Sequence, residues 1–360
     1  GLKELFNNAV ASGIEFSTEY QNADTYIVSV PTPYDKSTKK INPAYVVKAI
    51  MDVLAVCSPS SIIVVESTIS PGTIDDYVRP LIDEYNVNND AQVSIVHAPE
   101  RIIPGNMINE LLANNRTIGA DRKEIGEKIK DLYASFCQGE IVVTDIRTAE
   151  MTKVVENTFR DINIAFANEL LKICSSDDLD VYEIIRIANK HPRVNILSPG
   201  PGVGGHCISV DPWFLVGDYP NLARLVRNAR ETNDSMPEYV LKRTSEIMEE
   251  NNILDPSKVG IYGLTYKEDV DDVRESPTLQ MMESMKSHLC AGTCKVYDPW
   301  VEDDIVPNQV HSLEEFLSGL EMVVVMVGHS QVKNNSDMFG DRIILDTRNL
   351  FRANERVYKL

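Results

Sequence analysis

Three short apolar runs, each followed by a turn, constrain the fold of this chain more than any other feature. They occupy residues 25–31 (TYIVSVP), 61–68 (SIIVVEST) and 93–99 (VSIVHAP), and helical stretches separate them. Apolar runs that alternate with helices are typical of parallel βα units whose strands are buried on both faces. Ligands of such sheets bind at the carboxyl ends of the strands. We therefore expect a ligand beside the turns VPTP, ESTISPG and HAPER.

A second α/β set follows a mainly helical middle. Residues 148–175 carry a helical pattern without Gly or Pro, a Gly- and Pro-rich loop spans 198–212, and residues 220–250 return to helix. New strands are expected at 259–264, 322–328 and 343–351, with a helix at 277–288. The sequence predicts an α/β fold of two Rossmann-like parallel-sheet domains joined by a central helical segment. We expect these parts to cover 1–147, 148–255 and 256–360.

Charge and cysteine content exclude some classes of partner. The 360 residues carry a formal net charge of -19, which argues against nucleic acid or an anionic membrane as the main partner. No apolar run approaches the roughly 20 residues that span a bilayer, and no secretory signal is visible. The six cysteines form no dense framework, so a reducing cytoplasm is the simplest setting.

The usual opening of a dinucleotide-binding sheet is not found before Thr25. Such a sheet starts with a strand, a G-x-G-x-x-G turn and a helix whose N-terminus holds the pyrophosphate. The GPGVGG at 200–205 follows no strand and does not fit that element. We therefore expect the N-terminal domain to lack its opening βα units, on the order of 60 residues, and the 360-residue chain to bind a dinucleotide poorly.

Cys207 lies in GGHC, directly after the Gly-rich turn. A cysteine is most often a small buried apolar residue. Here glycines allow backbone and ligand to approach closely, and polar residues (His206, Ser209 and Asp211) lie beside the thiol in the sequence. A thiolate that attacks an aldehyde gives a thiohemiacetal, which can lose a hydride to become a thioester. We predict that Cys207 is the nucleophile in the oxidation of an alcohol to a carboxylate.

Lys153, Asn157 and Arg160 share one face of the long helical stretch, at i, i+4 and i+7. The face is either a solvated polar surface or part of a site where lysine and amide hold water or a developing oxyanion. A desolvated lysine can also act as a base. Glu100, at the end of HAPE, is a candidate to position water for thioester hydrolysis, whereas Glu66 is expected to be structural.

Four basic or titratable residues in loops are candidates for phosphate contacts. His191 and Arg193 in NKHPRVN are either structural or a cationic site for phosphate or carboxylate. Lys267 in GLTYK and Arg274 in DDVRESP lie where a strand meets its loop, which suits a diphosphate.

A metal site is not expected. His288, Cys290 and Cys294 form H-x-C-x3-C, but the second cluster that a zinc site usually needs is missing from the sequence.

Eight motifs in order resemble the UDP-glucose/GDP-mannose dehydrogenase family, closest to the branch that oxidises UDP-N-acetyl-D-mannosamine. They run from about residue 24 to residue 350 and are VPTP, ESTISPGT, APER, TAEMTKVVENTFRDINIAFANEL, HPRVNIL, PGPGVGGHCISVDPWF, GLTYKEDVDDVRESP and LDTR. The resemblance implies a four-electron oxidation at C6 that uses two NAD per sugar and releases no free aldehyde. It identifies 1–147 as an NAD-binding domain, 148–255 as a dimerisation and catalytic segment, and 256–360 as a UDP-sugar-binding domain.

The resemblance also assigns roles by position. It implies catalytic roles for Cys207, Lys153, Asn157, Asp211 and Glu100. It implies cofactor contacts for Thr32, Thr68 and Arg274. On the substrate side it implies contacts from Arg101, Ile102, Lys153, Asn157, Arg160, His191, Arg193, Gly204, Tyr266, Lys267 and Arg348. The expected assembly is a homodimer or higher homo-oligomer that packs through the long helix.

Alternatives remain for the substrate and for the class of protein. Pro104 stands where many UDP-glucose dehydrogenases carry a second glutamate, which favours a substrate with an N-acetyl group. UDP-N-acetylglucosamine is the next candidate, followed by UDP-glucose or GDP-mannose. A non-catalytic nucleotide-sugar-binding protein is the alternative from another class. NAD rather than NADP follows from the resemblance alone, because the residues that distinguish them belong to the missing opening.

Overall fold

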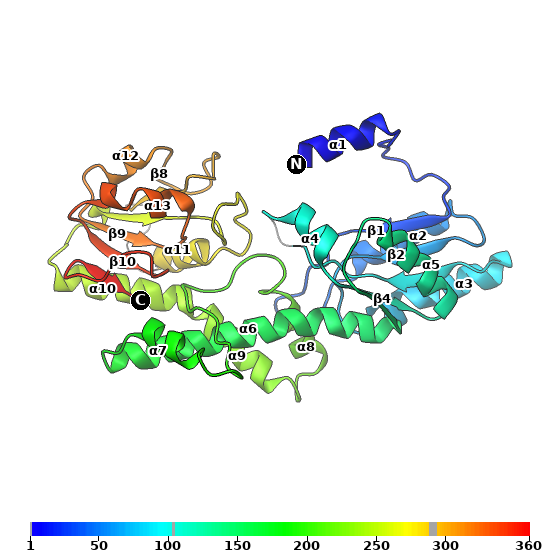
Figure 1. Cartoon of the computed structure of the whole chain (residues 1–360), viewed down its shortest axis with the longest axis horizontal. Coiled ribbons are helices and arrows are strands. Elements are labelled where there is room, and N and C mark those ends of the chain that lie inside the picture. The colour runs from blue at the N-terminus through cyan, green and yellow to red at the C-terminus, as the bar shows by residue number, and fades with distance from the viewer. Residues whose placement is uncertain (1, 103–104, 288–293) are drawn as a thin grey trace. The chain divides into compact units, whose positions relative to one another are not determined.

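The computed structural model describes residues 2–102, 105–287 and 294–360. The chain forms two compact units, of which unit 1 comprises 1–157 and 213–222 and unit 2 comprises 158–212 and 223–360. Each unit is built around one sheet with helices packed on it (Figure 1). The boundaries expected at 147 and 255 describe functional segments and stay a prediction.

Unit 1 contains a five-stranded sheet in the order β1-β2-β3-β4-β5. The strands are β1 (Thr25–Val28), β2 (Ile62–Val65), β3 (Ser94–His97), β4 (Arg116–Ala120) and β5 (Ile141–Thr144). Neighbouring strands are parallel except for β3 and β4, which are antiparallel. The three expected parallel strands are therefore confirmed, and their carboxyl ends lie at one edge of the sheet.

Helical elements connect the strands of unit 1, and those that contribute to its two apolar clusters pack on the two faces of the sheet. The helical elements are α1 (Leu2–Ala11), α2 (Ala44–Leu54), the π-helical turn η1 (Ile74–Val78), α3 (Arg79–Asn89), α4 (Met107–Ala113) and α5 (Lys123–Ala134). Ile63 and Val65 of β2 belong to the apolar cluster that α2 and α3 complete, and Ile62 and Val64 belong to the cluster that α5 completes. Because side chains alternate along a strand, this fully buried strand stabilises both faces, by about 1.5–3 kcal/mol for each side chain.

Residues 2–24 contain helix α1 and no strand. The expected lack of opening βα units in this domain stays a prediction.

The 31-residue helix α6 (Ile146–Ser176) confirms the helical pattern at 148–175. It is followed by α7 (Val181–Ala188), α8 (Asp211–Asp218), α9 (Arg224–Asp234) and α10 (Met236–Glu250). The helical stretch expected at 220–250 is confirmed and consists of two helices, α9 and α10. Pro237 lies in the first turn of α10, where its missing N–H costs nothing, so a new helix starts there.

Unit 2 contains a six-stranded, fully parallel sheet in the order β11-β10-β9-β6-β7-β8. The strands are β6 (Val259–Tyr262), β7 (Lys295–Tyr297), β8 (Gln309–Val310), β9 (Met322–Val325), β10 (Ile343–Asp346) and β11 (Val357–Lys359). The helical elements between them are η2 (Pro256–Lys258), α11 (Pro277–Ser287), α12 (Leu313–Leu317), α13 (Ser330–Asn334) and η3 (Ser336–Phe339). One core cluster joins this sheet to α6, α7, α10 and α11, so the second α/β set is confirmed.

Candidate active site

Cys207 lies in an exposed turn that leads directly into α8. Its carbonyl oxygen accepts hydrogen bonds from the N–H groups of Val210, at 3.1 Å, and Asp211, at 2.9 Å. Of the five cysteines that the structure describes, Cys207 is exposed and the other four are buried. Cys207 is therefore the accessible thiol among the cysteines that the structure describes.

Glycines let the backbone around Cys207 pack closely against residues 266–277, which follow β6. We call residues 198–210 the thiol loop. Gly205 has a φ of +83°, and a Cβ there would lie 2.8 Å from the Tyr266 ring. A Cβ on Gly204 would lie 2.5 Å from the Glu275 carbonyl oxygen. A side chain at Gly204 would meet backbone, and one at Gly205 would meet the Tyr266 ring at a positive φ, so both positions favour glycine.

Arg274 and Tyr266 interact electrostatically with the thiol of Cys207. Both interact with Cys207 through charge, and the Arg274 carbonyl accepts a hydrogen bond from Gly205 N–H at 2.9 Å. Burial, followed by the charges of Asp272 and Cys207, raises the pKa of Tyr266. Burial and the Arg274 charge lower the pKa of His206. Next to Cys207, therefore, stand a guanidinium and an imidazole that favours its neutral form.

The Arg274 guanidinium also pairs with Asp272, with Nη2 and Oδ2 2.6 Å apart. Its role as a cofactor contact stays a prediction.

Asp298 fixes the turn that carries Tyr266 and Lys267. Its buried Oδ2 accepts hydrogen bonds from the N–H groups of Leu264, at 2.6 Å, and Thr265, at 3.1 Å. The Thr265 hydroxyl in turn donates to the Lys267 carbonyl at 2.8 Å. Two predicted substrate-side residues thus follow β6 in a turn whose backbone is held by a buried carboxylate.

Other predicted substrate-side residues in unit 2 are exposed. Arg348 lies against the thiol loop, because its Nη1 is 2.7 Å from the position of a Cβ on Gly200. His191 and Arg193 are exposed on one turn, where Arg193 N–H donates to His191 Nδ1 at 3.3 Å. Arg160 is exposed on α6.

Lys153 and Asn157 are both buried on α6, with 6% and 7% of each residue exposed. Asp211, the first residue of α8, is 3% exposed. The three residues expected to share one face of α6 therefore differ in exposure, because Lys153 and Asn157 are buried and Arg160 is exposed. Lys153 and Asn157 are thus shielded from bulk water, and their catalytic roles stay a prediction.

Glu100 and Arg101 are held in place inside unit 1. Glu100 Oε1 accepts a hydrogen bond from Arg101 N–H at 2.6 Å, and Oε2 accepts one from the buried Arg116. The Arg101 guanidinium donates to both carboxylate oxygens of Glu156, at 2.7 and 2.8 Å, and to Thr117. Ile102 follows and is partly buried. Within this unit Arg101 serves as an internal ion-pair partner, and its substrate role stays a prediction.

The loops that follow β1 and β2 are joined at the carboxyl edge of the sheet. The Ser67 hydroxyl accepts a hydrogen bond from Val30 N–H and donates one to the Val30 carbonyl, each at 2.7 Å. Thr32 is buried and Thr68 is partly buried in these two loops. Hydroxyl and backbone donors at this edge are the groups that fit a dinucleotide.

Glu66, expected to be structural, accepts hydrogen bonds from Ser29 and Tyr133.

The sequence did not single out Glu150, a residue of α6 that hydrogen-bonds to the loop after β2. Its fully buried carboxylate accepts hydrogen bonds from Gly72 N–H at 2.6 Å and Ile74 N–H at 3.0 Å. Arg147 lies over Gly72 and pairs with Asp75, with Nη1 and Oδ2 3.6 Å apart. The signal was present in the sequence, since Glu150 is a carboxylate on the side of α6 that packs on the sheet, three residues before Lys153.

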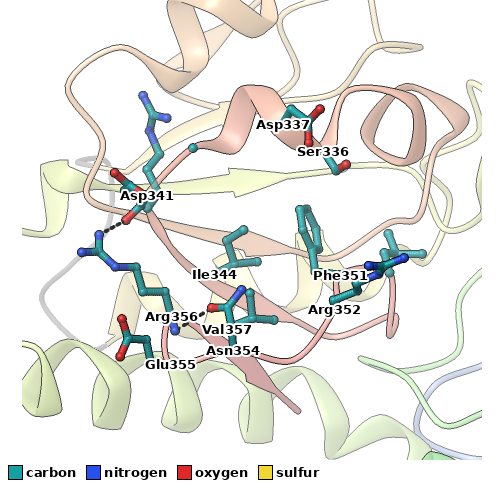
Figure 2. A pocket seen from close by; sticks show the side chains of 13 residues that line it. Ser336, Asp337, Asp341, Ile344, Phe351, Arg352, Asn354, Glu355, Arg356 and Val357 are labelled. Atoms are coloured by element: carbon teal, nitrogen blue, oxygen red, sulfur yellow. Dashed lines mark hydrogen bonds between the residues drawn. The ribbon is translucent and has the colours of Figure 1, made fainter.

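A hollow of about 1080 Å³ lies along β10, β11 and η3 in unit 2 and contains none of the predicted site residues (Figure 2). Arg356 crosses it to hydrogen-bond the Asp341 carbonyl. Three arginines and three carboxylates line this hollow: Arg342, Arg352, Arg356, Asp337, Asp341 and Glu355.

Within residues 2–102, 105–287 and 294–360, no group of three or more His, Cys, Asp and Glu is placed to hold a metal. His288, Cys290 and Pro104, which bore on the metal and substrate predictions, lie outside the described residues. Among the described helices, none has both the length and the apolarity that crossing a membrane requires.

Comparisons with known proteins assign the class. Residues 1–137 match the NAD binding domain of the UDP-glucose/GDP-mannose dehydrogenase family, 147–235 its central domain and 260–353 its UDP binding domain. The two sheets, the helical centre and the thiol loop are thus those of an NAD-dependent dehydrogenase. The chain belongs to the UDP-glucose/GDP-mannose dehydrogenase family.

Several relatives resemble nearly the whole chain. The UDP-N-acetyl-D-mannosamine dehydrogenase of Methanocaldococcus jannaschii is 41% identical over 97% of this chain and 81% of its own length. The Escherichia coli enzyme of the same name is 37% identical over 98% of this chain and 87% of its own length. The native structure of the UDP-N-acetyl-mannosamine dehydrogenase Cap5O from Staphylococcus aureus is 40% identical, with a TM-score of 0.87, and the match covers 100% of this chain and 85% of that one.

Proposed function

We propose that this protein oxidises UDP-N-acetyl-D-mannosamine at C6 to UDP-N-acetyl-D-mannosaminuronate, with NAD as the hydride acceptor and Cys207 as the nucleophile. Relatives named UDP-N-acetyl-D-mannosamine dehydrogenase, about 40% identical over almost the whole chain, support this substrate. The accessible thiol in a glycine-lined loop is the observation that carries the mechanism. UDP-N-acetylglucosamine and UDP-glucose are the alternative substrates.

The chemistry balances as two oxidations and one hydrolysis. When bound, NAD would supply the acceptor for two hydrides, one from the C6 alcohol and one from the thiohemiacetal, and one proton would be released with each. Between these oxidations the Cys207 sulfur bonds to the aldehyde carbon, so no free aldehyde leaves. Water then cleaves the resulting thioester, which releases the carboxylate and restores the thiol.

The residues of this chain prepare the thiol and the water. Arg274 carries a positive charge close to Cys207 and favours the thiolate. Lys153 and Asn157, buried on α6, would hold the oxyanion and the attacking water, and Asp211 and Glu100 would orient that water. Tyr266, Lys267 and Arg348 would hold the nucleotide part of the substrate, assisted by His191 and Arg193.

The NADH yield for each sugar nucleotide tests this function. With full-length protein and excess NAD, about two NADH per UDP-N-acetyl-D-mannosamine are expected, together with the uronate product. Cys207→Ser should form no uronate, because its hydroxyl is a far weaker nucleophile. Full uronate production by Cys207→Ser refutes the thioester route, and a higher kcat/KM for UDP-N-acetylglucosamine or UDP-glucose transfers the assignment to that sugar.

We also propose a homodimer that packs along α6, in a cytoplasmic protein. Phe159, Phe166 and Ile173 are exposed by 66%, 54% and 52% and recur every seven residues, the spacing of a helix–helix seam. Size-exclusion chromatography with light scattering should show a monomer for Phe166→Asp and a dimer for the control Leu254→Asp. Leu254 is 91% exposed and lies outside α6. An unchanged dimer in Phe166→Asp excludes this seam.

A further inference from the structure

Four polar side chains form a continuous hydrogen-bonded chain inside unit 2. Asp161 and Asn168 belong to α6, and Arg230 and Asn233 belong to α9. All four are buried, with exposures of 0% for Asp161, Asn168 and Asn233 and 1% for Arg230. Burial of polar groups costs folding free energy unless they are hydrogen-bonded, so the hydrogen bonds of these four side chains are important.

The chain starts at a guanidinium and ends at the backbone of the thiol loop. Arg230 Nη1 donates to Asp161 Oδ1 at 2.6 Å, and Asn233 Nδ2 donates to the same oxygen at 2.8 Å. Asn168 Nδ2 donates to Asn233 Oδ1 at 2.8 Å. The Asn168 Oδ1 then accepts a hydrogen bond from Gly200 N–H at 2.9 Å.

Each amide in this chain has a fixed orientation. Asn233 donates to Asp161 and accepts from Asn168, so its oxygen and nitrogen cannot exchange places without losing both bonds. The same orientation then directs the Asn168 oxygen to Gly200 N–H. Burial raises the pKa of Asp161, whereas the Arg230 charge and the hydrogen bonds from Asn233 and Arg230 lower it, so the ion pair supports the charged form that orients Asn233.

The contact at Gly200 is one of several that hold the thiol loop and residues 195–197, which directly precede it. Asn163, also on α6, accepts a hydrogen bond from Leu197 N–H at 2.9 Å and donates to the Asn195 carbonyl at 2.8 Å. On the other side, Gly205 packs on Tyr266 and donates to the Arg274 carbonyl. Cys207 follows two residues later. Its position therefore depends on where α6 places the backbone at 195–200.

We propose that Asn168 is a positioning residue for the thiol of Cys207, supported by Asn233, Asp161 and Arg230. Asn168 itself touches neither substrate nor cofactor in this role. It fixes the backbone at Gly200, and the rest of the network fixes Asn168. The inference rests on the proposed function of Cys207 as nucleophile, because only a nucleophile needs its sulfur held in place.

The test combines kinetics with a chemical probe of the thiol. Asn168→Ala in the full-length protein should lower kcat by about 10-fold or more, since small displacements of a reacting group are costly, and should leave the KM for NAD within about 2-fold. Iodoacetamide labelling of Cys207, followed by peptide mass spectrometry over a pH series, should show a changed rate and a shifted apparent pKa. Asn168→Asp keeps the acceptor for Gly200 N–H, so it should recover part of kcat.

Asn251→Ala is the matched control. Asn251 donates hydrogen bonds to the Ile247 carbonyl and the Tyr358 hydroxyl in the same unit, so its loss is structural and should leave kcat and labelling unchanged. Wild-type kcat and labelling in folded Asn168→Ala overturn the proposal. If that variant does not fold, wild-type values for both in Asn168→Leu, which has a similar volume but no acceptor for Gly200 N–H, overturn it instead. If Asn168→Ala changes the labelling of Cys207 but the wild-type protein oxidises no UDP-sugar, the positioning role is supported and the proposed function is refuted.

Discussion

Glu150 makes the stability of unit 1 depend on pH in a direction opposite to that of most carboxylates. Burial raises the pKa of Glu150 from an ordinary 4.5 to about 7, against the lowering effects of Gly72 N–H, Ile74 N–H and Arg147, while Asp75 raises it further. The folded state therefore binds the proton more tightly than the unfolded state does. Its contribution to stability is complete below the unfolded pKa and is lost as the pH rises through the folded pKa.

The magnitude follows from the difference between the two pKa values. A change from 4.5 to about 7, at about 1.4 kcal/mol for each pKa unit, corresponds to about 3 kcal/mol of stability lost between pH ~4.5 and ~8. Glu150→Gln removes the titration and leaves a neutral side chain of the same shape. As the pH rises through this range, the parent should therefore lose about 3 kcal/mol of unfolding free energy relative to Glu150→Gln.

The two tryptophans allow this measurement on unit 1 alone. Trp213 belongs to unit 1 and Trp300 to unit 2, so urea unfolding is followed by Trp213 fluorescence in a Trp300→Phe background. Glu124→Gln, which alters a side chain that is 69% exposed, is the control and should follow the parent at every pH. Parallel stability curves for Glu150→Gln and the parent would refute the reasoning.

Three further changes have expected results. Arg230→Met leaves the Asp161 carboxylate buried without its ion pair and should cost about 3–5 kcal/mol in urea unfolding, less in a double variant with Asp161→Leu. Gly205→Ala places an alanine at a positive φ and its Cβ against the Tyr266 ring, so it should lower the free energy of unfolding by about 1–3 kcal/mol and lower kcat. An active, equally stable variant contradicts this. Asp298→Ala removes the acceptor for Leu264 and Thr265 N–H and should raise the KM for the UDP-sugar more than that for NAD.

The strands were predictable because their residues are buried on both faces. Residues 62–65 are four consecutive buried aliphatic residues, and 322–325 repeat this pattern. Strand β4 (RTIGA) was not foreseen, since Arg116 and Thr117 weaken the apolar pattern although all five residues are buried. Arg116 is tolerated there because Glu100 and Glu66 pair with it, and pairings between distant residues are not visible in local periodicity.

The candidate site was predictable as a set of residues and less as a geometry. The Gly-rich context of Cys207 indicated close backbone contact, and Gly204 and Gly205 do pack against Tyr266. The seven-residue spacing of Asp161 and Asn168 on α6 was present in the sequence, but their partners Arg230 and Asn233 lie on another helix. Hydrogen bonds across 65 or more residues depend on packing that no local pattern contains.

The thiol loop has a consequence for the order of events during synthesis. Its fixed shape needs Asn168 before it in the chain and Tyr266, Arg274 and Arg348 after it. Contacts this distant in sequence form late in folding, so a growing chain exposes Cys207 on the ribosome well before residue 348 is made. In that interval the thiol is open to oxidation without a fixed environment. A fast-folding C-terminal sheet would therefore shorten the time that Cys207 spends without the contacts that fix the thiol loop.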